Sequence, residues 1–183
     1  MTRSTTLVLI YGLLALAFVA CGKTENTTSK EAPVPSPAPS QTATPQLISS
    51  ASVVQVRAPG VDVAAGSSVE ASVMLTIESG YHVNANPPSQ SYLIPTELTV
   101  EAADGLTAGK PAYPPSVTKK FAFDPKPLAV YEGETTIKLP LKAASTASKG
   151  THTLNAKLQV QACDDKACYR PATIGTSIPV TIK

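Results

Sequence analysis

The chain has 183 residues, enough for one domain with short appendages, and hydrophobic residues make up 43% of it. Seventeen prolines and the absence of tryptophan argue against a mainly helical fold. The formal net charge of +2 is small and no Lys/Arg cluster accompanies it, so we expect no nucleic-acid partner.

The N-terminus is typical of an export signal, which we expect to span residues 1–20. An apolar run from Leu7 to Val19 has the length of a signal core and is short for a membrane span. Cys21 follows the small Ala20, which resembles the lipobox of bacterial lipoproteins, although Phe18 stands where leucine is usual. We therefore expect lipid attachment at Cys21, which would explain the odd number of cysteines. The alternative is a plain secreted protein with a free Cys21.

Residues 21–47 are rich in proline, serine and threonine and poor in large apolar residues. Such a composition cannot bury enough apolar surface to offset the entropy lost on ordering, so we expect a disordered, lipid-anchored linker. Its alternating prolines favour an extended tether that holds the folded domain, residues 48–183, off the membrane.

From residue 48 onward the pattern changes to short alternating strands separated by turn residues. Val69–Ile77 and Thr135–Lys142 show the clearest alternation. Further strands are expected at Ser52–Ala58, Tyr81–Asn84, Leu93–Val100, Val117–Phe123, Leu154–Ala162 and Ile174–Ile182. No segment has convincing helical periodicity. The sequence therefore predicts an all-β fold, an antiparallel β-sandwich of immunoglobulin-like type.

Two cysteines, Cys163 and Cys168, lie where the Leu154–Ala162 strand ends and the last strand begins. Four residues separate them, and such a turn can bring their Cα atoms within disulfide range. A bond closing so small a ring constrains little chain entropy, which favours a reversible redox pair over a staple. Small secreted domains nevertheless use cysteines mostly as staples, so both interpretations stay open. Period two places Cys163 on the polar face with Gln161, accessible to a partner unless a bulge intervenes.

The histidines and tyrosines give weaker signals. His82 and His152 lack the spacing of a ligand set, so we expect no metal site and no cofactor. Tyr113, Tyr131 and Tyr169 could form a wall near the cysteine pair or belong to the core.

Three segments resemble motifs of one known family. They are Gly80–Val83 with the proline-rich loop after it, Leu128–Gly133, and Val160–Pro171 followed by Ile178–Val180. The segment with the two cysteines is the most specific of the three. Together they make residues 48–183 similar to the N-terminal periplasmic domain of the thiol:disulfide interchange protein DsbD.

The resemblance implies an immunoglobulin-like domain whose Cys163–Cys168 pair cycles between dithiol and disulfide. In that family the domain takes electrons from a thioredoxin-like domain and gives them to periplasmic disulfide isomerases and to thioredoxins of cytochrome c biogenesis. The resemblance also implies that Cys168 forms the mixed disulfides, that Cys163 resolves them, and that a cap loop around Val130 and Tyr131 shields the pair. Some family members have two acidic residues and a phenylalanine in that cap, whereas this chain has apolar residues there.

We therefore expect a thiol–disulfide oxidoreductase that relays electrons in the bacterial cell envelope, as a monomer anchored by lipid and facing the periplasm. Its expected partners are thioredoxin-fold periplasmic proteins. The chain stops at Lys183 without a transmembrane conduit, so a separate membrane protein is the expected electron donor. The alternative is a non-catalytic, lipid-anchored immunoglobulin-like binding module whose disulfide is structural.

Overall fold

The computed structural model describes residues 48–101, 103 and 105–183. The expected signal peptide, Cys21 and the linker lie outside these residues. Within them the chain forms one 3-10 turn, η1 (Ser50–Ser52), and twelve β-strands. No helix in this described part is long and apolar enough to cross a membrane.

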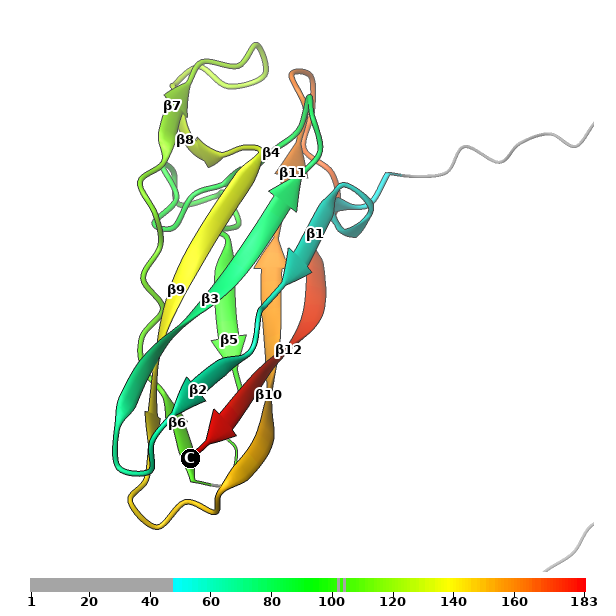
Figure 1. Cartoon of the computed structure of the whole chain (residues 1–183). Helices are drawn as coiled ribbons and strands as arrows, with labels where there is room; N and C mark the ends of the chain where they lie inside the picture. Colours follow the sequence, from blue (N-terminus) through cyan, green and yellow to red (C-terminus); the bar gives the residue numbers. More distant parts are fainter. Residues whose placement is uncertain (1–47, 102, 104) are drawn as a thin grey trace, which may run out of the picture. The chain divides into compact units, whose positions relative to one another are not determined.

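Two four-stranded sheets form the sandwich (Figure 1). The first has the order β1 (Val54–Arg57), β3 (Ser68–Ile77), β9 (Glu134–Ala143) and β6 (Leu106–Ala108). The second has the order β2 (Val61–Val63), β12 (Ala172–Ile182), β10 (Gly150–Val160) and β5 (Glu97–Val100). All neighbours in these sheets are antiparallel except β2 and β12, which run parallel at an edge. The expected all-β, immunoglobulin-like antiparallel sandwich is confirmed.

The alternation of the long strands builds the core between the two sheets. Along β3, β9, β10 and β12 buried and more exposed positions alternate, and every buried position is apolar. Leu75, Leu139, Leu158 and Ile178 are almost completely buried there. Burying each such side chain contributes about 1.5–3 kcal/mol, so the alternation of the long strands supplies a large part of the stability of the core.

A third sheet of four short strands lies at the end of the sandwich away from the C-terminus (Figure 1). This small sheet has the order β11 (Ala162–Cys163), β4 (His82–Asn84), β8 (Leu128–Tyr131) and β7 (Val117–Lys119). One of its faces carries the aligned residues Ala162, Val83 and Tyr131, which belong to the main core. Its other face carries Cys163 opposite His82, so the small sheet places a cysteine and a histidine side by side.

Several of the short strands differ from the sequence pattern. Val117–Phe123 was expected as one strand, but β7 ends at Lys119 and residues 120–126 leave the sheet. The strand expected at Leu93–Val100 begins only at Glu97. Thr96 instead donates two hydrogen bonds to the Asn84 carbonyl, one from its amide at 3.2 Å and one from its hydroxyl at 2.7 Å. β2, β6 and β8 have three or four residues each, too few to show a clear alternation.

Candidate redox site

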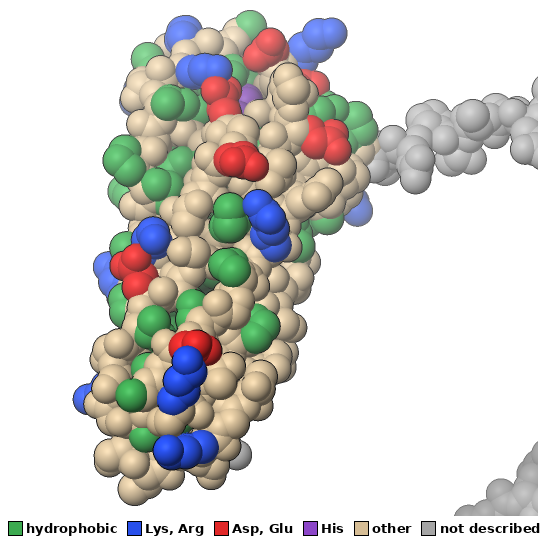
Figure 2. All heavy atoms as spheres, viewed as in Figure 1, with side chains coloured by type: hydrophobic (Ala, Val, Ile, Leu, Met, Phe, Trp, Pro, Cys, Tyr) green, Lys and Arg blue, Asp and Glu red, His purple; other side chains and the backbone are tan. Residues whose placement is uncertain are grey.

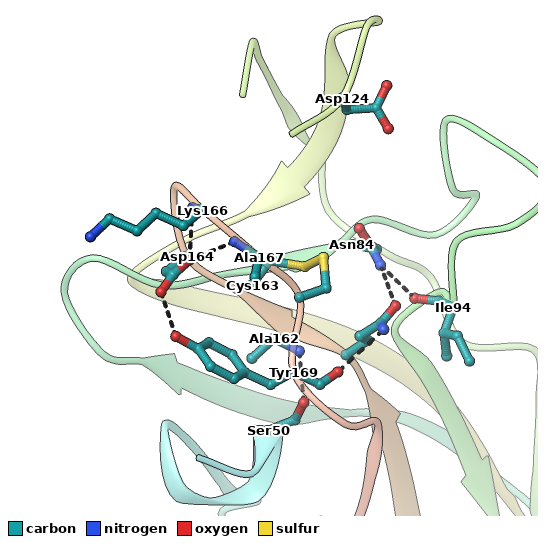
Figure 3. Close-up of a disulfide and its surroundings, with 12 residues drawn as sticks. Ser50, Asn84, Ile94, Asp124, Ala162, Cys163, Asp164, Lys166, Ala167 and Tyr169 are labelled. Carbon is teal, nitrogen blue, oxygen red and sulfur yellow. Dashed lines mark hydrogen bonds between the residues drawn. A yellow bond between two sulfur atoms is a disulfide. The ribbon is translucent and has the colours of Figure 1, made fainter. Parts of the chain in front are cut away.

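Cys163 and Cys168 form a disulfide with an Sγ–Sγ distance of 2.00 Å and a Cα–Cα distance of 3.9 Å (Figure 3). Cys163 ends β11, and Cys168 lies across the turn, where it forms an isolated antiparallel bridge with Cys163. The Tyr169 amide continues this pairing by donating to the Ala162 carbonyl at 2.8 Å. The backbone of the hairpin therefore sets the two cysteines opposite each other.

Asp164 organises the turn between the cysteines (Figure 3). Its Oδ1 accepts hydrogen bonds from the amides of Lys166 and Ala167, both at 2.8 Å, and its Oδ2 accepts one from the Tyr169 hydroxyl. The Tyr169 hydrogen bond is the largest cause, and the two amides the next, of a pKa for Asp164 lowered to about 2. The same bond raises the pKa of Tyr169 to about 12.

Ser50 joins the N-terminal 3-10 turn to the base of this hairpin. Its hydroxyl donates to the Arg170 carbonyl at 2.6 Å and accepts from the Ala162 amide at 2.9 Å. Ser50 is completely buried, so these bonds satisfy polar groups that water does not reach. The hairpin is therefore fixed to the sandwich on both of its strands.

The two cysteines differ in exposure. Cys163 is 0% exposed, whereas Cys168 is half-buried. The strand alternation correctly predicts that Cys163 lies on the face of the strand opposite to the core residue Ala162. The expectation that Cys163 is accessible is wrong, because the small sheet is covered on that face too.

The cover consists of residues 120–126, which we call the cap segment. Phe121 stacks on the His82 ring with centroids 4.0 Å apart and an interplanar angle of 16°, and Phe123 lies 5.4 Å from Phe121. Phe121 also belongs to a second apolar cluster with Leu93, Leu128 and Val130. An aromatic layer therefore lies over the face of the small sheet that carries Cys163.

Val130 and Tyr131, the residues expected in the cap loop, both lie in β8 and are buried. Val130 is part of the floor beneath the cap segment. Tyr131 points to the opposite face, where its hydroxyl accepts a hydrogen bond from the Asn86 amide at 3.2 Å. The segment that covers the cysteine pair is therefore the cap segment, which precedes Val130 and Tyr131 in the chain.

A hollow of about 300 Å³ opens next to Cys168, and we call it the Cys168 hollow. Phe123 and Asp124 of the cap segment line it, together with Tyr92, Leu93, Gln161 and Ala167. The Tyr92 hydroxyl donates to Asp124 Oδ2 at 2.5 Å, and the Lys126 amide donates to Oδ1 at 2.9 Å. These two bonds lower the pKa of Asp124, the Tyr92 bond most. The Tyr92 bond also ties the cap segment to the loop before β5.

Sequence reasoning missed the aromatic and acidic residues of the cap segment. The pattern Phe-Ala-Phe-Asp-Pro was their only signal, and both phenylalanines fall within the strand expected at Val117–Phe123. Of the three tyrosines considered, Tyr169 alone borders the hairpin, with its ring 5.8 Å from Tyr81. The Tyr113 hydroxyl instead accepts from the Leu98 amide at 2.9 Å. Within the described residues, no three His, Cys, Asp or Glu side chains could together hold a metal ion.

The fold and the site define a β-sandwich domain with a disulfide on a short hairpin beneath an aromatic loop. The family described as "Thiol:disulfide interchange protein DsbD, N-terminal" matches residues 45–178. The chain therefore belongs to the family of DsbD N-terminal domains, which are thiol–disulfide exchange domains. No curated protein sequence shows a significant match.

Several solved structures are similar in fold. The reduced N-terminal domain of DsbD from Neisseria meningitidis shares 18% identity, with 74% of this chain and 91% of that chain covered and a TM-score of 0.48. The N-terminal periplasmic domain of ScsB from Proteus mirabilis shares 16%, covering 68% and 44%, with a TM-score of 0.46. A type I cohesin from Pseudobacteroides cellulosolvens shares 14%, covering 72% and 92%, with a TM-score of 0.34.

Proposed function

We propose that this domain relays electrons between thioredoxin-fold partners in the bacterial cell envelope, with Cys163–Cys168 as its redox pair. The observation that carries the proposal is the unequal exposure of the two cysteines. Cys163 is fully buried, whereas Cys168 is half-buried and borders a hollow of about 300 Å³. A partner sulfur approaching from solvent therefore meets Cys168 first, which is the order that an exchange reaction with one attacking and one resolving thiol requires.

The reaction proceeds in two steps when the domain donates electrons. The Cys168 thiolate attacks the disulfide of an oxidised partner, forms a mixed disulfide, and releases one partner sulfur as a thiolate. The Cys163 thiolate then attacks Cys168, forms the intramolecular disulfide, and releases the second partner sulfur. Two electrons pass to the partner, and the same steps in reverse reduce the domain. The 3.9 Å between the Cα atoms keeps the resolving thiol next to the mixed disulfide.

The cap segment serves as the shield that the family resemblance leads us to expect, in place of Val130 and Tyr131 themselves. Phe123 lines the same hollow as Cys168, and Asp124 holds the segment through the Tyr92 hydroxyl. Tyr92 is 65% exposed, so a docking partner can displace this hydrogen bond at its surface end. Opening the cap segment would then uncover Cys168 while the small sheet stays in place.

The proposed setting is the periplasmic side of a bacterial membrane, with the chain exported and anchored by lipid at Cys21. The domain acts as a monomer, receives electrons from a membrane protein, and serves thioredoxin-fold proteins such as those of cytochrome c biogenesis. Membrane fractionation and mass analysis of the mature N-terminus test the anchor. A soluble product that begins with an unmodified Cys21 would rule it out.

The reduction potential of the pair tests the proposed function. The full chain carrying Cys21→Ser, which leaves Cys163 and Cys168 as its only thiols, is equilibrated with a thiol–disulfide buffer, and the oxidised fraction is measured by alkylation and mass analysis. Relay disulfides have potentials above about −300 mV, and structural bridges of secreted proteins lie below it. We expect a value above this limit. A value well below it would support the structural disulfide of a binding module instead.

A further inference from the structure

His82 lies directly beside the buried cysteine of the pair. Its Cα is the register partner of Cys163 between the antiparallel strands β4 and β11. Residues opposite each other in such a pair project their side chains to the same face with Cβ atoms about 4.5–5.5 Å apart. His82 is 2% exposed and Cys163 is 0% exposed, and Phe121 covers the His82 ring. The imidazole is therefore enclosed with Cys163 under the cap segment.

The Nε2 atom of His82 is buried and has no hydrogen-bond partner. A buried polar atom without a partner costs about 1–3 kcal/mol, so a native domain seldom keeps one without a use for it. Desolvation by burial lowers the pKa of His82 below 6.5, so the ring is neutral near pH 7. A neutral imidazole with a free ring nitrogen can accept a proton.

A second hollow, separate from the Cys168 hollow, connects His82 with solvent. It measures about 480 Å³, and its lining includes His82, Lys119, Glu132 and Asp165. The charged groups that act on His82 are Glu132 after β8, Asp164 and Asp165 in the hairpin, and Lys119 at the end of β7. Acidic and basic side chains lie side by side at this end of the domain (Figure 2). This His82 hollow gives the imidazole an outlet lined by charged side chains, and Cys168 is not part of that lining.

We propose that His82 is the proton acceptor for the resolving thiol of Cys163. The inference rests on the proposed relay function and adds the residue that makes its second step possible. His82 Nε2 takes the proton from the Cys163 thiol, and the resulting thiolate attacks Cys168 Sγ. The Cys163–Cys168 bond forms, the bond between Cys168 and the partner sulfur breaks, and the partner leaves as a thiolate. The imidazolium then releases its proton through the His82 hollow.

The need for an acceptor follows from the burial of Cys163. Only the thiolate is nucleophilic, and apolar surroundings disfavour it relative to the thiol. Water reaches Cys168 but does not reach Cys163, which is 0% exposed. A positioned general base typically accelerates a proton transfer of this kind by about 10²–10⁴-fold. His82 supplies that base on the side of the pair away from the docking partner.

The two chemical steps can be followed separately with dithiobis(nitrobenzoate), a small aromatic disulfide. The reduced full chain carrying Cys21→Ser should release one thionitrobenzoate when Cys168 attacks the reagent, and a second when Cys163 resolves the adduct. We expect His82→Phe, which keeps a ring stacked under Phe121, to slow the second phase by about 100-fold at pH 7 and to leave the first unchanged. His152→Phe is the matched control, since His152 lies on β10 and contacts the Ser148 carbonyl at 2.8 Å.

The pH profile separates a proton acceptor from a packing residue. In the unsubstituted protein the rate of the second phase should rise through the pKa of His82, measured in the same protein by NMR, below 6.5. In His82→Phe this inflection should vanish and leave only the rise from ionisation of the buried Cys163 thiol itself, above the free-thiol pKa of about 8.5. If His82→Phe does not fold, the profile of the unsubstituted protein decides alone, and the lack of an inflection at the His82 pKa overturns the inference.

The outcomes distinguish this inference from the relay itself. Two phases with the same rates and pH profiles in the unsubstituted protein and in His82→Phe would overturn the role of His82 and leave the relay intact. A reduced protein that never releases a second thionitrobenzoate would overturn the relay, and the role of His82 with it.

Discussion

The Tyr169 hydroxyl donates a hydrogen bond to the Asp164 carboxylate, and this pair closes the hairpin that carries both cysteines. Asp164 directly follows Cys163, and Tyr169 directly follows Cys168. The carboxylate also accepts two backbone amides within the turn, so one side chain fixes the turn and both of its ends. The positions of the two sulfurs therefore depend on a polar contact next to them in the sequence.

Tyr169→Phe should raise the pKa of Asp164 from about 2 toward 3.8, because it removes the largest cause of the shift. The pKa of the folded state is depressed, so Asp164 stabilises the fold above pH 3.8 and loses this contribution as the pH falls toward 2. The variant should therefore lose less stability over that interval. Carboxyl NMR titration measures the pKa directly. Tyr81→Phe is the control, and an Asp164 pKa that stays near 2 in Tyr169→Phe would contradict the assignment.

Ser50→Ala should lower the free energy of unfolding by about 1–3 kcal/mol, because it leaves the Ala162 amide and the Arg170 carbonyl without their partner. Denaturant unfolding measures this loss. The control is Ser52→Ala in the same turn, since Ser52 is exposed and bonds only locally to the Ser49 carbonyl at 2.7 Å. Equal effects from the two variants would mean that Ser50 does not anchor the hairpin.

Phe123→Ala should accelerate oxidation of the dithiol by small disulfides severalfold, because Phe123 lines the Cys168 hollow and belongs to the cap segment. Its side chain is only partly buried, so the variant should keep the fold. Stopped-flow oxidation by a small aromatic disulfide gives the rate.

Val117→Ala is the matched control for this prediction, since Val117 is 49% exposed on β7 and lies before the cap segment. An oxidation rate in Phe123→Ala equal to that of Val117→Ala would show that the cap segment does not shield the pair.

The long strands could be predicted because their alternation is a local property. Val69–Ile77 corresponds to β3, and Thr135–Lys142 lies within β9. The position of the cysteine pair in a hairpin could also be predicted, since one strand pattern ends at Ala162, directly before Cys163, and the next begins only at Ile174, after Cys168.

The surroundings of the pair could not be predicted, because they depend on contacts between distant segments. His82 and Cys163 are 81 positions apart in the numbering, and only the β4–β11 register makes them neighbours. Period two gives the face on which Cys163 lies but not what covers that face. The cover comes from Phe121 and Phe123, and their alternation also fits an edge strand. Exposure therefore required the tertiary structure.

Trapping of mixed disulfides tests the central claim most directly. Cys163→Ser and Cys168→Ser variants of the exported chain are compared in the periplasm after acid quenching, by non-reducing electrophoresis and mass analysis of the adducts. We predict that Cys163→Ser accumulates mixed disulfides through Cys168 with thioredoxin-fold proteins, because Cys168 is accessible and its resolving thiol is gone. Cys168→Ser should form far fewer, because Cys163 is buried. The absence of adducts in both variants, or a greater yield in Cys168→Ser, would contradict the account.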